Sequence, residues 1–246
     1  MKCIILCGGY AKRLWPLTKT IPKPLLDING KLMIDIILDK FSNVDEIKEI
    51  IISTNARFEK NFMDWLEKNN KTGKKLKIVI EPTHEEDFKF GTIAGIQHVI
   101  KSEKICEDCI IVAGDNLFDY SINDFIKYYK TKNTAILAVF DVKDRIKAQL
   151  YGIVALNENN KVIDFIEKPS NPPSTLAATC CYLFPKDIMK LIGVYIDEGN
   201  RKDSPGYFID WLRKRTSVHA FVFKGHWFDI GDLESLENAR EFIKKN

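Results

Sequence analysis

The sequence contains no apolar run that approaches the ~20 residues needed to cross a bilayer, and it has almost no excess of charge. Lys and Arg number 37 against 34 Asp and Glu, which gives a net charge of +3 at pH 7. Because the two signs of charge nearly cancel, the composition argues against wholesale binding to nucleic acid or to a membrane surface. The start, Met1-Lys2 followed by five apolar residues and a glycine pair, does not resemble a secretory leader. We therefore expect a soluble, cytoplasmic protein without nucleic-acid or membrane partners.

Cysteine is too scarce for a disulfide framework. Six cysteines in 246 residues fit reduced core positions better than a set of structural disulfides. Cys106 and Cys109 form one C-x-x-C pair, but no second pair accompanies it in the sequence. A zinc or redox protein built on these two thiols stays open as an alternative, and it predicts stoichiometric zinc in the purified protein.

The familiar phosphate-binding motifs are missing as well. The sequence has neither the Gly-x-Gly-x-x-Gly of dinucleotide-binding folds nor the Gly-x-x-x-x-Gly-Lys-Ser/Thr of P-loop enzymes. Internal repeats and low-complexity tracts are also absent from it. A length of 246 residues suits one large α/β domain, or two small domains, for which no obvious linker is seen; we expect one domain.

What the sequence does have is a glycine pair and several cations directly after its first apolar run. The uncharged residues 3–7 predict a buried strand. Gly8 and Gly9 let the backbone approach a ligand closely, and Arg13 and Lys23 supply positive charge nearby. Ligands of open parallel sheets bind outside the carboxyl ends of the strands, so this loop suits a nucleotide. From these residues alone, an ordinary strand-to-helix turn with solvated charges is the simpler alternative.

Hydrophobic periodicity predicts strands that alternate with helices, followed by a change of pattern. In the first part, strands are expected at 49–53, 76–80, 109–113 and 135–140. Helices are expected at 31–41, at 58–66, in a segment that begins at 91, and at 122–130. In the second part, a hairpin is expected at 152–156 and 162–167, strands at 175–184 and 218–223, and helices at 186–192, 207–212 and 233–243. We therefore expect an α/β fold: a Rossmann-like, mixed but mainly parallel sheet flanked by helices, with a smaller antiparallel portion.

The first loop resembles the signature of the sugar nucleotidylyltransferases, the enzymes that make nucleoside-diphosphate sugars. Their pattern is roughly Gly-Gly-x-Gly-x-Arg-Leu-x-Pro-Leu-Thr, with Pro-Lys-Pro-Leu-Leu a few residues later. The matching residues, in the same order and spacing, are Gly8, Gly9, Arg13, Leu14, Pro16, Leu17, Thr18, Pro22, Lys23, Pro24, Leu25 and Leu26. The chain departs from the pattern at Ala11, where the family usually has glycine, and at Lys12. Because alanine can hardly adopt a left-handed conformation, we expect the backbone to differ there.

Later motifs extend the resemblance to a nucleobase and a metal site. Gly91 and Thr92 match a motif that helps to read the nucleobase edge, and they also suit the start and cap of a helix. Asp115 matches the Gly-Asp motif whose aspartate holds the catalytic metal; without the family it could equally cap a helix or sit in a turn. Asp229 matches the second metal ligand, in the motif Trp-x-Asp-x-Gly-Thr. Asp232 stands where that motif has threonine, and we expect it to cap the helix that follows.

Two motifs in the second half imply a sugar site. Tyr151-Gly152 and Glu167-Lys168 resemble the Tyr-Gly and Glu-Lys-Pro motifs of the family. By that resemblance the glutamate accepts hydrogen bonds from sugar hydroxyls, the lysine pairs with the sugar 1-phosphate, and the glycine lets the sugar ring approach the backbone. Without the family, Glu167 and Lys168 are only an exposed charge pair at a strand end.

The resemblance implies one nucleotidylyltransferase domain over residues 1–246, with a nucleotide-binding part at about 1–140, a sugar-binding part at about 141–225 and a closing metal motif and helix at 226–246. It implies that Asp115 and Asp229 bind Mg²⁺ against the triphosphate. It assigns Arg13 to the pyrophosphate, Lys23 to the α-phosphoryl region and Lys168 to the attacking sugar phosphate.

The expected partners are a nucleoside triphosphate and a sugar 1-phosphate. Gly-Asp-Asn together with Glu-Lys-Pro favours glucose 1-phosphate with dTTP or UTP. A relative that uses CTP or GTP on another sugar phosphate is the nearest alternative, and a non-catalytic regulatory subunit that binds nucleotide sugar is a second. The sequence leaves homo-oligomer formation open.

Overall fold

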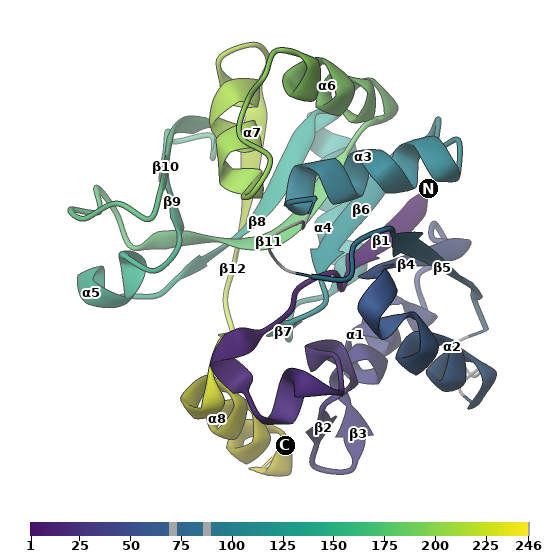
Figure 1. Ribbon diagram of the computed structural model, residues 1–246. Coiled ribbons are helices and arrows are strands. Elements are labelled where there is room, and N and C mark those ends of the chain that lie inside the picture. The colour runs from purple at the N-terminus through teal and green to yellow at the C-terminus, as the bar shows by residue number, and fades with distance from the viewer. Residues whose placement is uncertain (69–72, 86–89, 246) are drawn as a thin grey trace.

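The structure is a computed structural model that describes residues 1–68, 73–85 and 90–245. Its centre is a twisted sheet with helices on both faces (Figure 1). Within the described residues this sheet has nine strands, and its main path runs β10-β9-β11-β6-β1-β4-β5, with β8 and β12 branching from β11. The expected mixed α/β fold is therefore confirmed.

The parallel half of the sheet leads into the first loop. Its strands are β1 (Lys2–Leu6), β4 (Glu49–Asn55), β5 (Lys75–Glu81) and β6 (Cys109–Ala113). β1 lies between β4 and β6, and Cys3 aligns with Ile50 on one side and Ile110 on the other. The interiors of β1, β4 and β6 are uncharged because helices cover both faces of the sheet, so successive side chains enter two different cores, whereas the edge strand β5 also carries charged residues.

The helices divide between those two cores. One face is covered by α1 (Met33–Ser42), α2 (Glu59–Lys68), α4 (Ile122–Lys132) and α8 (Leu233–Lys245). The other face is covered by α3 (Thr92–Ser102), α6 (Lys186–Asp197) and α7 (Pro205–Arg213). The alternation begins in β1, where Cys3 and Ile5 enter the first core while Ile4 enters the second.

The antiparallel portion consists of β8 (Ala135–Asp141), β9 (Gly152–Leu156), β10 (Val162–Glu167) and β11 (Leu176–Phe184), with β12 (Val218–Phe223) parallel to β8. β11 joins the two portions because it pairs with β6 as well as with β8 and β9. The register of β11 against β8 shifts between Ala178 and Tyr182. Cys180 lies in this bulge with a left-handed φ of 51°.

Several short elements were not expected from the sequence. β7 (Asn116–Phe118) and β13 (Trp227–Asp229) form a small antiparallel ribbon, β2 (Asp27–Ile28) and β3 (Lys31–Leu32) form another, and α5 (Arg145–Ala148) precedes the hairpin. The β7–β13 ribbon aligns Asn116 with Asp229. These two residues are 113 positions apart in the sequence.

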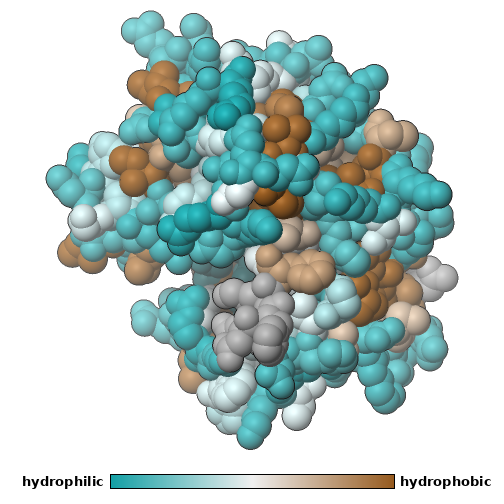
Figure 2. Space-filling view, turned by 45° about the horizontal axis from the view of Figure 1, so that its top comes forward, coloured by the Kyte–Doolittle hydropathy of each residue, from teal (hydrophilic) through white to brown (hydrophobic). Residues whose placement is uncertain are grey.

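The longer elements agree with the sequence-based expectations to within a few residues, except that α6 extends to Asp197. Part of the loop between β5 and α3, residues 86–89, lies outside the described residues. No described helix combines the length and the apolar character that a membrane crossing requires. The face in Figure 2 is mostly hydrophilic, with scattered apolar patches and a recess on its left side.

Candidate active site

Two adjoining cavities open where β1, β5 and β6 end. The first has a volume of about 310 Å³, and its lining includes Gly8, Gly9, Gly91, Thr92, Asp115 and Asp229. The second has a volume of about 540 Å³, and its lining includes Tyr151, Gly152, Glu167, Lys168 and Asp229. The sequence-predicted nucleotide residues thus line one cavity and the sequence-predicted sugar residues line the other. Asp229 borders both.

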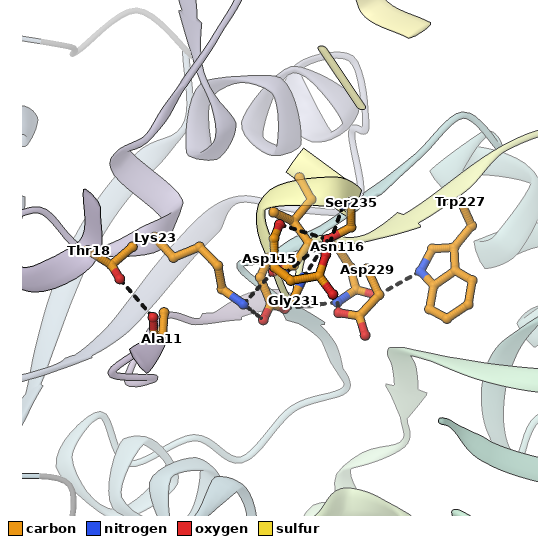
Figure 3. Close-up of polar contacts among 11 residues, drawn as sticks. Ala11, Thr18, Lys23, Asp115, Asn116, Trp227, Asp229, Gly231 and Ser235 are labelled. Carbon is orange, nitrogen blue, oxygen red and sulfur yellow. Dashed lines mark hydrogen bonds and ion pairs between the residues drawn. The ribbon is translucent and has the colours of Figure 1, made fainter. Parts of the chain in front are cut away.

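The two predicted metal ligands meet at this border. Asp115 follows β6, and Asp229 is the last residue of β13. The Asn116 side-chain amide donates to Asp115 Oδ1 at 2.8 Å and to Asp229 Oδ1 at 3.2 Å (Figure 3). Since one amide nitrogen contacts both carboxylates, the two acids lie side by side at the border of the two cavities.

The electrostatics of the two acids differ. Lys23 Nζ donates to Asp115 Oδ2 and to the Ile230 carbonyl, both at 2.6 Å. Burial alone would raise the pKa of Asp115, but the Lys23 ammonium and hydrogen bonds outweigh it and the pKa is lowered. Burial, reinforced by the Asp115 charge, raises the pKa of Asp229 to about 6. The pair therefore carries negative charge that one lysine does not fully neutralise.

Arg13 lies near Asp229. A Cβ atom on Gly231 would lie 3.1 Å from Arg13 Nη2, so the guanidinium packs directly against this backbone. The Arg13 charge also acts to lower the pKa of Asp229. Two cations from the first loop, Arg13 and Lys23, thus reach the carboxylate pair.

The backbone of the first loop is left-handed at Ala11, with φ 48° and ψ 44°. The expectation that alanine avoids this conformation is therefore wrong. The Thr18 hydroxyl donates to the Ala11 carbonyl at 2.7 Å (Figure 3), and this bond holds the strained residue in place. The Asn55 side-chain amide likewise donates to the Gly8 carbonyl at 3.0 Å, which fixes the loop over the end of β4.

Glu81, at the end of β5, lines the first cavity and was not singled out from the sequence. Its Oε1 accepts from the Ser53 hydroxyl at 2.9 Å, and burial raises its pKa. A Cβ on Gly8 or on Gly95 would lie 2.9 Å from the same oxygen, so both glycines make room for this carboxylate. Its position as the last residue of a strand was the available signal, but Glu81 begins an acidic loop in which it does not stand out.

Gly91 and Thr92 line the first cavity, and this segment also contacts the loop that precedes α7. The Ile93 N–H donates to the Lys202 carbonyl at 3.0 Å, and the Thr92 hydroxyl donates to the Asp203 carbonyl at 3.2 Å. Gly91, with φ 80°, is the N-cap of α3, and no side chain caps this helix. The alternative role of Thr92 as the helix cap is therefore wrong.

In the lining of the second cavity, the Glu167 carboxylate lies between two glycines. A Cβ on Gly152 would lie 3.1 Å from Glu167 Oε2, and one on Gly206 would overlap this oxygen. Burial raises the pKa of Glu167. Lys168 has a left-handed φ of 47°, and its N–H donates to the Tyr151 carbonyl at 3.0 Å, which links the two sugar motifs.

Asp232 accepts the Ser235 N–H at 2.9 Å, so its expected role as the cap of α8 is confirmed.

The carboxylate pair fits a hard divalent cation. Asp115 and Asp229 offer oxygen ligands of the kind that Mg²⁺ takes, and their mutual repulsion would be relieved by positive charge. No group of three or more His, Cys, Asp or Glu side chains that could hold a metal occurs among the described residues. The other Mg²⁺ ligands would therefore be phosphate and water. The same finding leaves Cys106 and Cys109 without a complete zinc site in the described part of the chain.

This fold and site define the class of protein. The chain belongs to the nucleotidyl transferase family, since the sequence model described as "Nucleotidyl transferase" matches residues 2–246.

Among individual relatives, the chain is 28% identical over 246 residues to the bifunctional protein GlmU of Methanocaldococcus jannaschii, covering 99% of this chain and 54% of the relative. It is also 28% identical over 271 residues to the glucose-1-phosphate adenylyltransferase of Clostridioides difficile, covering 100% of this chain and 67% of the relative. The chain thus spans about half the length of the GlmU relative.

The structure of a UDP-glucose pyrophosphorylase complexed with UDP-glucose is similar to this chain, with a TM-score of 0.83 at 22% identity. The similarity covers 100% of this chain and 99% of that chain. At this identity the comparison establishes the fold.

Proposed function

We propose that this protein transfers a nucleotidyl group from a nucleoside triphosphate to a sugar 1-phosphate, producing a nucleoside-diphosphate sugar and pyrophosphate. The observation that carries the proposal is the meeting of Asp115 and Asp229 between two cavities, with one amide bonded to both acids. Cations approach this pair from the first loop, and Lys168 lines the second cavity. Such a site suits two anionic reactants held against one divalent ion.

In this proposal the first cavity receives the nucleotide. Gly8 and Gly9 bring backbone close to the phosphates, while Gly91 and Thr92 border the space for the base and sugar of the nucleotide. Arg13 steadies the developing charge on the pyrophosphate. Arg13 thus acts where negative charge accumulates, and the glycines act where a side chain would obstruct the ligand.

The second cavity receives the sugar 1-phosphate. Glu167 accepts hydrogen bonds from sugar hydroxyls, and Gly152 leaves room for the ring. Lys168 orients the phosphate whose oxygen attacks the α-phosphorus, and Lys23 neutralises charge on the α-phosphoryl group. The attacking oxygen is already ionised near neutral pH, so no side chain need remove a proton.

Asp115 and Asp229 would hold Mg²⁺. When bound, this ion supplies Lewis-acid stabilisation of the phosphoryl charge and a fixed point for both substrates. Since Lys23 pairs with Asp115 in the structure, the lysine must share or release this carboxylate when the ion binds.

We further propose glucose 1-phosphate with dTTP or UTP as the substrates. The similarity to a protein named glucose-1-phosphate adenylyltransferase supports the sugar but leaves the base open. A relative that uses CTP or GTP is the alternative. A regulatory subunit without turnover is disfavoured because a protein that only binds would not need Arg13, Lys23, Asp115, Lys168 and Asp229 together.

The test is magnesium-dependent release of pyrophosphate, screened over the common nucleoside triphosphates and several sugar 1-phosphates. Asp229→Asn preserves the shape of the side chain and removes its charge, and we expect turnover to fall at least ~100-fold, since several kcal/mol of metal-assisted stabilisation is lost. Asp187→Asn, on the exposed surface of α6, is the matched control and should keep full activity. Near-normal turnover in Asp229→Asn would refute the metal assignment, and binding without release for every pair would favour the regulatory subunit.

A further inference from the structure

The Asn116 side chain contacts three other side chains at the border of the two cavities. Besides donating to both acids, its amide oxygen accepts the Trp227 indole N–H at 2.6 Å (Figure 3). We propose that Asn116 and Trp227 are positioning residues, which hold Asp115 and Asp229 at the separation that a divalent cation requires. This inference depends on the metal site of the proposed function.

The orientation of the amide follows from hydrogen-bond chemistry. An indole nitrogen can only donate, so the atom facing Trp227 must be the amide oxygen. The amide NH₂ group then faces the acids, and its two hydrogens serve one carboxylate each. Trp227 on one side and the two acids on the other therefore fix the same orientation of the Asn116 amide.

The surrounding structure holds both residues in this arrangement. Asn116 is only 3% exposed, and it aligns with Asp229 across the β7–β13 ribbon. The Trp227 ring packs edge-on against Tyr151, with ring centroids 4.9 Å apart, and near Phe140 at 6.0 Å. An aromatic wall of the sugar cavity is thus connected to the acids through a single hydrogen-bonded amide.

Removing the indole N–H would release this arrangement. Without this donor, only the bonds to the two acids hold the Asn116 amide, so the amide can tilt. Two acids that repel each other would then be held less firmly, and they would move apart. Outer groups that orient the ligands of a metal typically change its affinity by ~10–100-fold when they are removed.

The experiment measures metal binding to the full chain without nucleotide, using Mn²⁺ followed by electron paramagnetic resonance. Trp227→Phe keeps an aromatic ring and removes the N–H, and we expect Mn²⁺ to bind ~10–100-fold more weakly. Trp211→Phe is the matched control, because Trp211 also donates its indole N–H to a carboxylate, that of Glu198 at 2.7 Å, away from the two cavities. Its Mn²⁺ affinity should equal that of the wild type.

A second variant covers the case in which Trp227→Phe fails to fold. Asn116→Ser removes the bridging amide and should weaken Mn²⁺ binding to a similar degree, with the circular dichroism of the wild type retained. Unchanged or tighter Mn²⁺ binding in a folded Trp227→Phe or Asn116→Ser protein overturns the positioning role. Asp229→Asn separates the two proposals: if it binds Mn²⁺ like the wild type, the metal site itself is wrong.

Discussion

Replacing Gly91 by alanine tests the contact between α3 and the loop that borders both cavities. Gly91 has φ 80° and ψ 156°, a region of backbone space that is essentially restricted to glycine. A Cβ there would lie 2.5 Å from the Lys202 carbonyl oxygen. That oxygen accepts the Ile93 N–H, so it belongs to a hydrogen-bonded backbone and cannot rotate aside like a flexible side chain.

The expected cost has two parts. Holding alanine in this conformation costs about 1–3 kcal/mol. Forcing a methyl group into occupied space costs about 1–3 kcal/mol more. We therefore expect Gly91→Ala to lose at least about 2 kcal/mol of unfolding free energy, which for a chain of this size lowers the melting temperature by at least ~4 °C. Because the strained loop also carries Asp203 and Pro205 into both cavities, KM should rise for both substrates.

Thermal unfolding followed by circular dichroism measures the stability, and pyrophosphate release measures KM. Gly9→Ala is the stability control: a Cβ on Gly9 would meet no atom within 4 Å, and its φ is not in the left-handed range. Its melting temperature should match that of the wild type. An unchanged melting temperature in Gly91→Ala would refute the reasoning, because it would mean that the loop does not press against this glycine in solution.

Three further outcomes follow from single contacts. Hydrogen-bonded ion pairs with Lys2 and then Lys75 lower the pKa of Glu49, so its stabilisation exists above pH 4.5 and is lost as the pH falls through the lowered pKa. Glu49→Gln should therefore cost about 1–3 kcal/mol at neutral pH in urea unfolding, and a difference that persists well below pH 4.5 would contradict this account. Lys168→Ala should raise KM for the sugar 1-phosphate ~10–100-fold, since a charged hydrogen bond is lost, with a smaller effect on KM for the nucleotide. Gly206→Ala should displace the Glu167 carboxylate and raise the same KM; unaltered kinetics would show that the carboxylate does not hold the sugar.

The parallel core could be predicted because the sequence of each of its inner strands is compatible with few structures other than a buried strand. An apolar run such as residues 109–113, bounded by charged and glycine residues, has few other ways to be buried. The β7–β13 ribbon could not be predicted in the same way. Each strand has only three residues, and the pairing joins Trp227 to Phe118 across more than a hundred positions. No local periodicity encodes such a contact, so only the folded chain reveals it.

The same reasoning separates the site residues that were found from those that were missed. Asp115 and Asp229 stand in motifs, and each could be assigned a role before its neighbours were known. Glu81 and Asn116 acquire their roles from partners far away in the sequence: Gly8 makes room for the first, and Trp227 helps to orient the second. A motif describes residues that are close in sequence, whereas hydrogen-bond partners are chosen by the fold.

Backbone conformation also depends on contacts that the local sequence does not reveal. Ala11, Lys168 and Cys180 all have left-handed φ values, although none of them is glycine or asparagine. An L-residue in this conformation costs roughly 1–2 kcal/mol, so local preference alone would predict against each of them. Ala11 lies in the first loop, and Lys168 and Cys180 line the second cavity. Hydrogen bonds to the Ala11 carbonyl and from the Lys168 N–H hold the first two in this conformation. Strain that tertiary structure sustains often collects at functional sites, and two of these residues, Lys168 and Cys180, line the second cavity.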